Sequence, residues 1–279
     1  MNETIDIICD TIYDQNERQK PPTPKSVFKR LLEIATGGIF LFDGKLYKTI
    51  DGVTMGSPLG PTLANFILAH FENKLLQETS IPLPALYLRY VDDIFCVFRE
   101  GVDSKPFFQA LKSFHVNLKF TVENGENCLS FLDTKVTLPL DDSTEASIDI
   151  FRKKTHTGLL LNFNAVCPRT WKCGLIFCLL NRAYNICSSW SLFDNEVDTL
   201  KSMFSMNGYP KDLFDNCLSK FLYKKFEPVE KREREDLDIV FCIPYVGQPS
   251  LLYKKKLIAL FKKYYDLKVS VVFLSLIHI

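Results

Sequence analysis

The sequence lacks the segments that would send the chain out of the cell or across a membrane. Its N-terminus, MNETIDIICD, is acidic and has neither the basic start nor the apolar core of a secretory or transit peptide. The apolar C-terminus, VSVVFLSLIHI, is about half the length of a membrane span and is typical of a buried strand or a frayed or foreign end. We therefore expect an intracellular protein with no membrane partner.

Paired cysteines are also missing. The nine cysteines occur singly, with no CxxC motif, which is typical of reduced thiols in an intracellular protein. Cys167, Cys173 and Cys178 form the only cluster, and their spacing fits no common zinc pattern. We expect them to act as small buried apolar residues.

The chain has little net charge, +1 at pH 7, so total charge neither requires nor excludes a nucleic-acid partner. Its distribution is more informative, because no Asp or Glu lies between Ile150 and Phe193. The basic residues of this stretch are Arg152, Lys153, Lys154, Arg169, Lys172 and Arg182, and its aromatic residues include Phe163, Trp171, Tyr184 and Trp190. This pattern predicts contacts with a nucleic-acid backbone. The alternative is a helical bundle with an aromatic core and solvated cations.

The chain is long enough, and at 47% hydrophobic residues apolar enough, to bury a core. Ile5, Ile8, Cys9 and Ile12 have helical spacing, and Asp43-Gly44 between two apolar runs is typical of a type I′ hairpin turn. We predict helices at 3–18, up to Thr36, 62–77, 104–113, 168–188, 193–205, 210–225 and 250–265, and strands at 39–42, 45–48, 116–122, 128–138 and 146–152, with turns at Asn124-Gly125 and Asp141-Asp142. The predicted fold class is α+β.

Two adjacent acids, Asp92 and Asp93, interrupt the apolar run Ala85–Phe98. This pattern predicts a tight β-hairpin with carboxylates at its tip. Adjacent carboxylates repel unless a cation lies between them, and Mg²⁺ prefers oxygen ligands. Two such ions can activate the attacking oxygen and stabilise the leaving oxygen in phosphoryl transfer. The alternative is a solvated turn, in which Asp is common.

A Gly- and Pro-rich loop lies about thirty residues earlier and includes Gly56, Ser57 and Pro58. Such a loop lets a nucleotide or nucleic-acid strand approach the main chain, and the helix that follows offers free N–H groups to phosphate. The alternative is an ordinary helix entry with Pro near the first turn.

Four segments in order, MGSPLGPTLANF, RYVDDIF, SFLDTKV and RKKTHTGLLLNF, resemble Penelope-like retroelement reverse transcriptases. The resemblance extends to about residue 260. It implies a polymerase palm, an antiparallel sheet with helices on one face, followed by a mainly helical thumb. It assigns 1–152 to partial fingers and palm, 153–225 to a thumb with a helix-turn-helix-like arrangement, and 226–279 to a C-terminal helical extension. For the last ten or so residues, a buried strand and a frayed or foreign end both stay open.

The same resemblance implies Mg²⁺ as cofactor, with Asp92 and Asp93 as catalytic ligands in a two-ion site. Tyr90, Gly56, Ser57 and Pro58 would lie near nucleotide or template. The implied partners are deoxynucleoside triphosphates and an RNA template with DNA primer, or an RNA–DNA hybrid, in the nucleus. The family's first catalytic Asp would lie before Met1, so we expect little polymerase activity from this chain alone. The alternative is a non-catalytic nucleic-acid-binding relic with a helix-turn-helix-like region.

Overall fold

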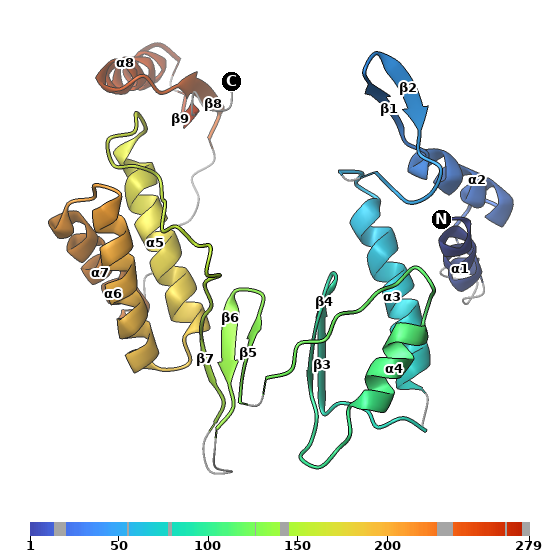
Figure 1. Ribbon diagram of the computed structural model, residues 1–279. Coiled ribbons are helices and arrows are strands. Elements are labelled where there is room, and N and C mark those ends of the chain that lie inside the picture. Colours follow the sequence, from blue (N-terminus) through green and yellow to red (C-terminus); the bar gives the residue numbers. More distant parts are fainter. Residues whose placement is uncertain are drawn as a thin grey trace. The chain divides into compact units, whose positions relative to one another are not determined.

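A computed structural model describes residues 1–13, 21–54, 56–77, 80–125, 127–139, 145–227, 237–265 and 267–274. Within these ranges it has mixed helices and strands, which confirms the α+β class (Figure 1). The chain divides into two compact units, Met1–Glu123 and Asn124–Ile279. The expected turn at Asp141-Asp142 and the end of the first predicted helix lie outside the described residues.

The first unit consists of four helices and two hairpins over its described residues. Its elements are α1 (Asn2–Tyr13), α2 (Lys25–Thr36), β1 (Ile39–Phe42), β2 (Lys45–Lys48), α3 (Gly60–Leu76), β3 (Leu86–Tyr90), β4 (Asp93–Val97) and α4 (Lys105–Ser113). Ile5, Ile8 and Cys9 of α1 are buried, as their spacing predicts. Asp43 and Gly44 both have positive φ, 48° and 71°, as a type I′ turn requires.

A small core joins the β3–β4 hairpin to α3 and α4. Leu75, Phe107 and Leu111 are buried, with Tyr87 and Phe98 packed against them. The expected strand at 116–122 does not form, and these residues run as turn and irregular chain after α4.

The second unit begins with a three-stranded antiparallel sheet and continues into three helices. Its elements are β5 (Cys128–Phe131), β6 (Thr134–Thr137), β7 (Ser147–Ile150), α5 (Arg169–Ile186), α6 (Trp190–Met206) and α7 (Lys211–Phe226). The apolar core lies among the three helices and includes Ile176, Leu180, Leu200, Phe204 and Phe214, each at most 2% exposed. The helices lie side by side in Figure 1.

The C-terminal segment differs from the expected helical extension. Strands β8 (Ile239–Pro244) and β9 (Val269–Leu274) pair in parallel, and α8 (Gln248–Tyr265) connects them. Lys254 Nζ of α8 donates to Val271 O of β9 at 3.1 Å, and Phe261 packs on Phe241 of β8. The segment is a β-α-β unit, so the apolar C-terminal run forms a strand as far as Leu274.

Among the described residues, no helix combines the length and the apolar character that crossing a bilayer requires.

Candidate functional sites: the acidic hairpin and the three-helix unit

The adjacent acids lie at the tip of the β3–β4 hairpin, as predicted. Val91 and Asp92 form the two-residue turn, and Asp93 begins β4 opposite Tyr90. The side chains of Asp92 and Asp93 are exposed. Val91 has φ +55°, an unfavourable conformation for a β-branched residue.

Arg89 fixes this hairpin to α3. Its Nε donates to Glu72 Oε1 at 2.5 Å, and its Nη1 donates to Asn65 Oδ1 at 2.9 Å and to Val91 O at 3.1 Å. Tyr87 donates to the same Glu72 oxygen at 2.6 Å. Burial is the main cause that raises the pKa of Tyr87, and the hydrogen bond to Glu72 is the second. The tip therefore lies beside the first turns of α3.

The Gly56-Ser57-Pro58 loop leads directly into α3. Gly56 has φ +91°, and Ser57 N donates to Thr54 O at 3.0 Å. Gly60 N donates back to Ser57 O at 3.1 Å and starts the helix. The loop and the acidic tip thus lie at neighbouring elements. Metal binding by the tip, and nucleotide or template binding by the loop and by Tyr90, which is 61% exposed, stay predictions.

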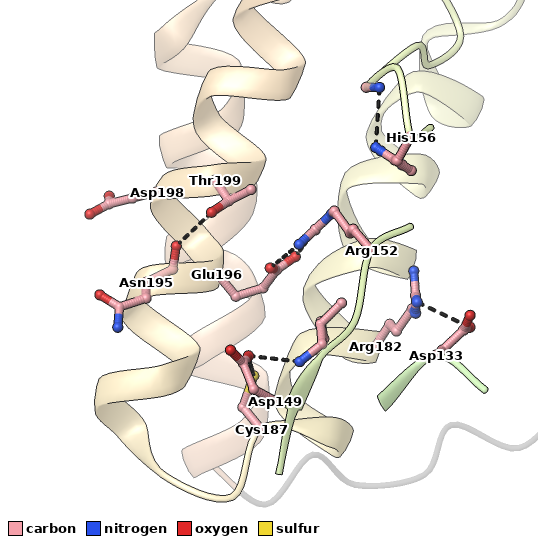
Figure 2. A network of polar contacts seen from close by, with 12 residues as sticks. Asp133, Asp149, Arg152, His156, Arg182, Cys187, Asn195, Glu196, Asp198 and Thr199 are labelled. Carbon is pink, nitrogen blue, oxygen red and sulfur yellow. Dashed lines mark hydrogen bonds and ion pairs between the residues drawn. The ribbon is translucent and has the colours of Figure 1, made fainter. Parts of the chain in front are cut away.

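A second hairpin tip repeats this backbone geometry. The sequence predicted one strand over 128–138, but Leu132 and Asp133 form a two-residue turn between β5 and β6, with Leu132 at φ +55°. Asp133 forms an ion pair with Arg182 of α5 at 3.0 Å (Figure 2). One sequence feature could have indicated this second turn: an aliphatic residue precedes Asp at both tips, in Val91-Asp92 and in Leu132-Asp133.

Two of the six predicted backbone-binding cations form ion pairs with carboxylates of the chain. Arg152 forms a bidentate pair with Glu196 of α6, which is 5% exposed (Figure 2). Arg182 is engaged with Asp133. Arg152 is therefore a structural residue that joins the segment after β7 to α6, a role that its position in the acid-free stretch did not predict.

The remaining four predicted cations are accessible to different degrees. Lys153, Lys154 and Arg169 are exposed, whereas Lys172 is half-buried with its ammonium 4.9 Å from the ring centre of Phe163. Arg169 and Lys172 belong to the first turn of α5. Contact of these four with nucleic acid stays a prediction.

Asn207 holds the segment before α5 against the end of α6. Its Nδ2 donates to Gly158 O and Met203 O, both at 2.8 Å, and its Oδ1 accepts from Leu160 N at 2.9 Å. Phe163 N donates to Asn207 O at 3.0 Å. Sequence reasoning missed this buried amide, although an Asn-Gly dipeptide signals the end of a helix.

Helices α6 and α7 are connected by the four residues 207–210, of which Gly208 has φ +81°. A short turn containing Gly between two packed helices occurs both in helix-turn-helix motifs and in helical hairpins. The first position of α7 follows Pro210, just as α5 follows Pro168, and neither cap residue supplies a side-chain acceptor. The first N–H groups of both helices therefore have no side-chain cap.

The starts of α5 and α7 border one depression, which we call the α5–α7 cleft. Its volume is about 490 Å³, and its walls include Phe163, Cys167, Arg169, Lys172, Pro210, Asp212, Leu213 and Asn216. Burial raises the pKa of the Cys217 thiol in α7 to about 11, and the charges of Lys220 and Arg169 oppose this rise.

The three cysteines that are close in sequence are less buried than expected. Cys167 and Cys173 are half-buried and Cys178 is exposed, in contrast to the expected burial of all three. Cys173 instead approaches Cys217 of α7. The described residues contain no group of three His, Cys, Asp or Glu side chains suited to hold a metal ion.

Comparison with known proteins gives one similarity. Residues 159–219 match the family model of the animal helix-turn-helix domain. The match starts in the segment held by Asn207, spans α5 and α6, and ends within α7. Neither the curated proteins nor the solved structures give a match to this chain.

Proposed function

We propose that the chain binds duplex DNA through its three-helix unit. The observation that carries the proposal is the α5–α7 cleft, where two helix N-termini without side-chain caps meet the cations Arg169 and Lys172. Helix N-termini and guanidinium or ammonium groups both favour phosphate oxygens. The match to a helix-turn-helix model supports the same surface.

The arrangement of α7 supports duplex DNA over an RNA–DNA hybrid. In helix-turn-helix proteins the second helix of the motif lies in the major groove and reads base edges with its N-terminal residues. Over residues 211–220, the exposed polar residues of α7 are Lys211, Asp212, Asn216, Ser219 and Lys220, and the last four share one face. The deep, narrow major groove of an A-form hybrid does not admit a helix.

The test measures binding of the full chain to duplex DNA, an RNA–DNA hybrid and single-stranded DNA of equal length by fluorescence anisotropy. We expect the duplex to bind most tightly and its affinity to fall steeply between 50 and 200 mM salt, because each phosphate contact releases counterions. Arg169→Glu with Lys172→Glu should weaken duplex binding at least about tenfold at low salt, since it replaces two phosphate contacts with repulsion.

The matched control changes Lys105 and Lys112 of α4 to Glu. Both are exposed, and the pair alters net charge by the same amount in the other unit. Equal weakening by both double variants would indicate non-specific attraction and would contradict the proposed surface.

We propose as a second candidate function that the β3–β4 tip is the metal-binding end of a polymerase palm, the function implied by the reverse-transcriptase resemblance. Asp92 and Asp93 supply exposed carboxylate oxygens, the ligand type that Mg²⁺ prefers, and Arg89 holds them beside α3. When bound, such ions would polarise phosphate oxygens.

This candidate is tested by Mn²⁺ binding, measured as the loss of the free-ion resonance signal, and by Mg²⁺-dependent primer extension, in which we expect little synthesis from this chain alone. Asp92→Asn with Asp93→Asn should abolish ion binding, whereas Asp103→Asn, an exposed acid of the same unit, should not. Ion binding that survives the double variant would refute the proposed ligands. Both measurements are independent of the α5–α7 cleft.

A further inference from the structure

A second cavity lies at the turn between α5 and α6, whereas the α5–α7 cleft lies at the start of α5. Its volume is about 260 Å³, and it is lined by Tyr184, Cys187, Ser188, Ser189, Trp190 and Phe193. Such a volume is below the usual range for drug-sized ligands, so it fits a small chemical group.

Three aromatic rings form much of this lining. The ring centres of Tyr184 and Trp190 are 5.9 Å apart, those of Trp190 and Phe193 5.5 Å, and those of Tyr184 and Phe193 6.3 Å. The interplanar angles are 61°, 87° and 87° respectively. Phe193 is 4% exposed and forms the floor, whereas Trp190 is 51% exposed at the rim.

The charge beside the cavity favours a cation. No Lys or Arg lines it, and the lining thiol of Cys187 donates to Asp149 Oδ1 of β7 at 3.8 Å. Figure 2 shows the two side chains together. The nearby Arg152 is already bound by Glu196.

The ring geometry decides between an aromatic ligand and a cationic one. A nucleobase is held best between parallel rings, but these three rings are steeply inclined to one another. Inclined rings around a small cavity present several electron-rich surfaces to one point, the arrangement that recognises quaternary ammonium groups. Ser188 and Ser189 leave part of the lining polar.

We propose that this cavity, which we call the α5–α6 aromatic pocket, binds a quaternary ammonium group. The binding rests on cation–π attraction from Tyr184, Trp190 and Phe193, aided by the carboxylate of Asp149. The proposal goes beyond DNA binding and does not depend on it.

Lys225 of α7 already forms a cation–π contact with one of the lining rings. Its ammonium lies 4.3 Å from the ring centre of Tyr184 and 5.5 Å from that of Phe221, although it does not line the cavity. Tyr184 therefore already attracts one cation within the chain. That charge opposes an incoming cation, so its removal strengthens ligand binding.

The two tryptophans of the chain give a direct assay. Trp171 of α5 does not line the cavity, and Trp171→Phe leaves Trp190 as the single tryptophan reporter. The probes are choline, its neutral carbon analogue 3,3-dimethylbutanol, and short peptides with trimethyl-lysine or unmodified lysine. We expect choline or the trimethyl-lysine peptide to change Trp190 fluorescence saturably, at least about tenfold more tightly than the matching neutral or unmethylated probe.

The two methylated probes distinguish the source of the ligand. Tighter binding of the peptide assigns it to a methylated protein side chain, and tighter binding of choline to a free or headgroup choline. Either result supports a quaternary ammonium site. Equal binding of choline and its neutral analogue, or no binding by any probe, overturns the proposal.

Calorimetry of ligand binding by variants completes the test. Trp190→Ala should abolish binding and Trp171→Ala, a change at another partly exposed tryptophan, should leave it intact. Lys225→Met should strengthen binding severalfold, with Lys224→Met, its exposed neighbour on α7, as control. Undiminished binding in Trp190→Ala, or weaker binding in Lys225→Met, contradicts the proposal.

Discussion

Arg152 and Glu196 bind each other through both ends of their charged groups, with Arg152 Nη1 2.7 Å from Glu196 Oε2 and Nη2 paired to Oε1. Because Glu196 is 5% exposed, its charge is compensated by this one guanidinium and not by water. The hydrogen bonding that Arg152 donates to Glu196 is also the main factor that raises the pKa of Arg152. The pair joins two segments separated by the whole of α5.

Removal of one member of this pair should destabilise the second unit strongly. We expect Arg152→Met to lower the free energy of unfolding by about 3–5 kcal/mol, since it leaves a buried carboxylate unpaired. Urea denaturation measures the loss. The double variant Arg152→Met with Glu196→Leu should recover most of it, because two apolar side chains need no partner. A loss below about 1 kcal/mol in the single variant would show that Glu196 is solvated.

Gly208 and Gly174 should respond oppositely to alanine. Gly208 has φ +81° in the α6–α7 turn, so Gly208→Ala should cost about 1–2 kcal/mol through backbone strain. Gly174 lies within α5, and a Cβ added there meets nothing within 4 Å. Gly174→Ala should therefore stabilise the helix by about 1 kcal/mol. If both variants shift the melting temperature in the same direction, either the positive φ of Gly208 or the helical conformation of Gly174 is wrong.

The two strained hairpin tips should be relieved by glycine. Val91 and Leu132 both have φ +55°, and a non-glycine residue held there costs about 1–3 kcal/mol. We expect Val91→Gly and Leu132→Gly to raise the free energy of unfolding relative to Val91→Ala and Leu132→Ala, which retain Cβ. Chemical denaturation compares each pair. Equal stability of the Gly and Ala variants would exclude backbone strain at these tips.

Cys217 should make stability fall in alkaline solution. Burial, together with the neighbouring Cys173, raises its pKa from 9.0 to about 11. Between these pH values the unfolded chain loses the thiol proton and the folded chain keeps it, so the folded state loses stability as pH rises.

Cys217→Ala should reduce this decline, whereas Cys178→Ala, at an exposed position of α5, should not. Denaturation midpoints between pH 8 and 11 measure the effect. An identical decline in the wild type and Cys217→Ala would contradict a buried thiol.

Local sequence patterns predicted the elements that depend on periodicity or turn chemistry. The apolar spacing of Ile5, Ile8 and Cys9 identified α1, and Asp43-Gly44 identified the β1–β2 turn. Asp92 and Asp93 were correctly placed at a hairpin tip. In each case a few neighbouring residues determine the conformation.

Features that depend on distant partners were missed. The β5–β6 turn at Leu132-Asp133 contains no Gly or Asn, and it packs through Asp133 on Arg182 of α5. Strand β8 forms by pairing with β9, about thirty residues later. Nothing near Glu196 in the chain indicates that it is buried, because its partner Arg152 precedes it by 44 residues.

The attachment of residues 158–163 to Asn207 determines where the three-helix unit can be separated from the rest of the chain. A fragment that starts at Arg169 would leave the amide of Asn207 without Gly158 and Leu160, and Glu196 without Arg152. Excision just before α5 would therefore leave unsatisfied polar groups within α6 and at its C-terminal end. The smallest self-sufficient piece should therefore begin no later than Arg152, so that both Glu196 and Asn207 keep their partners.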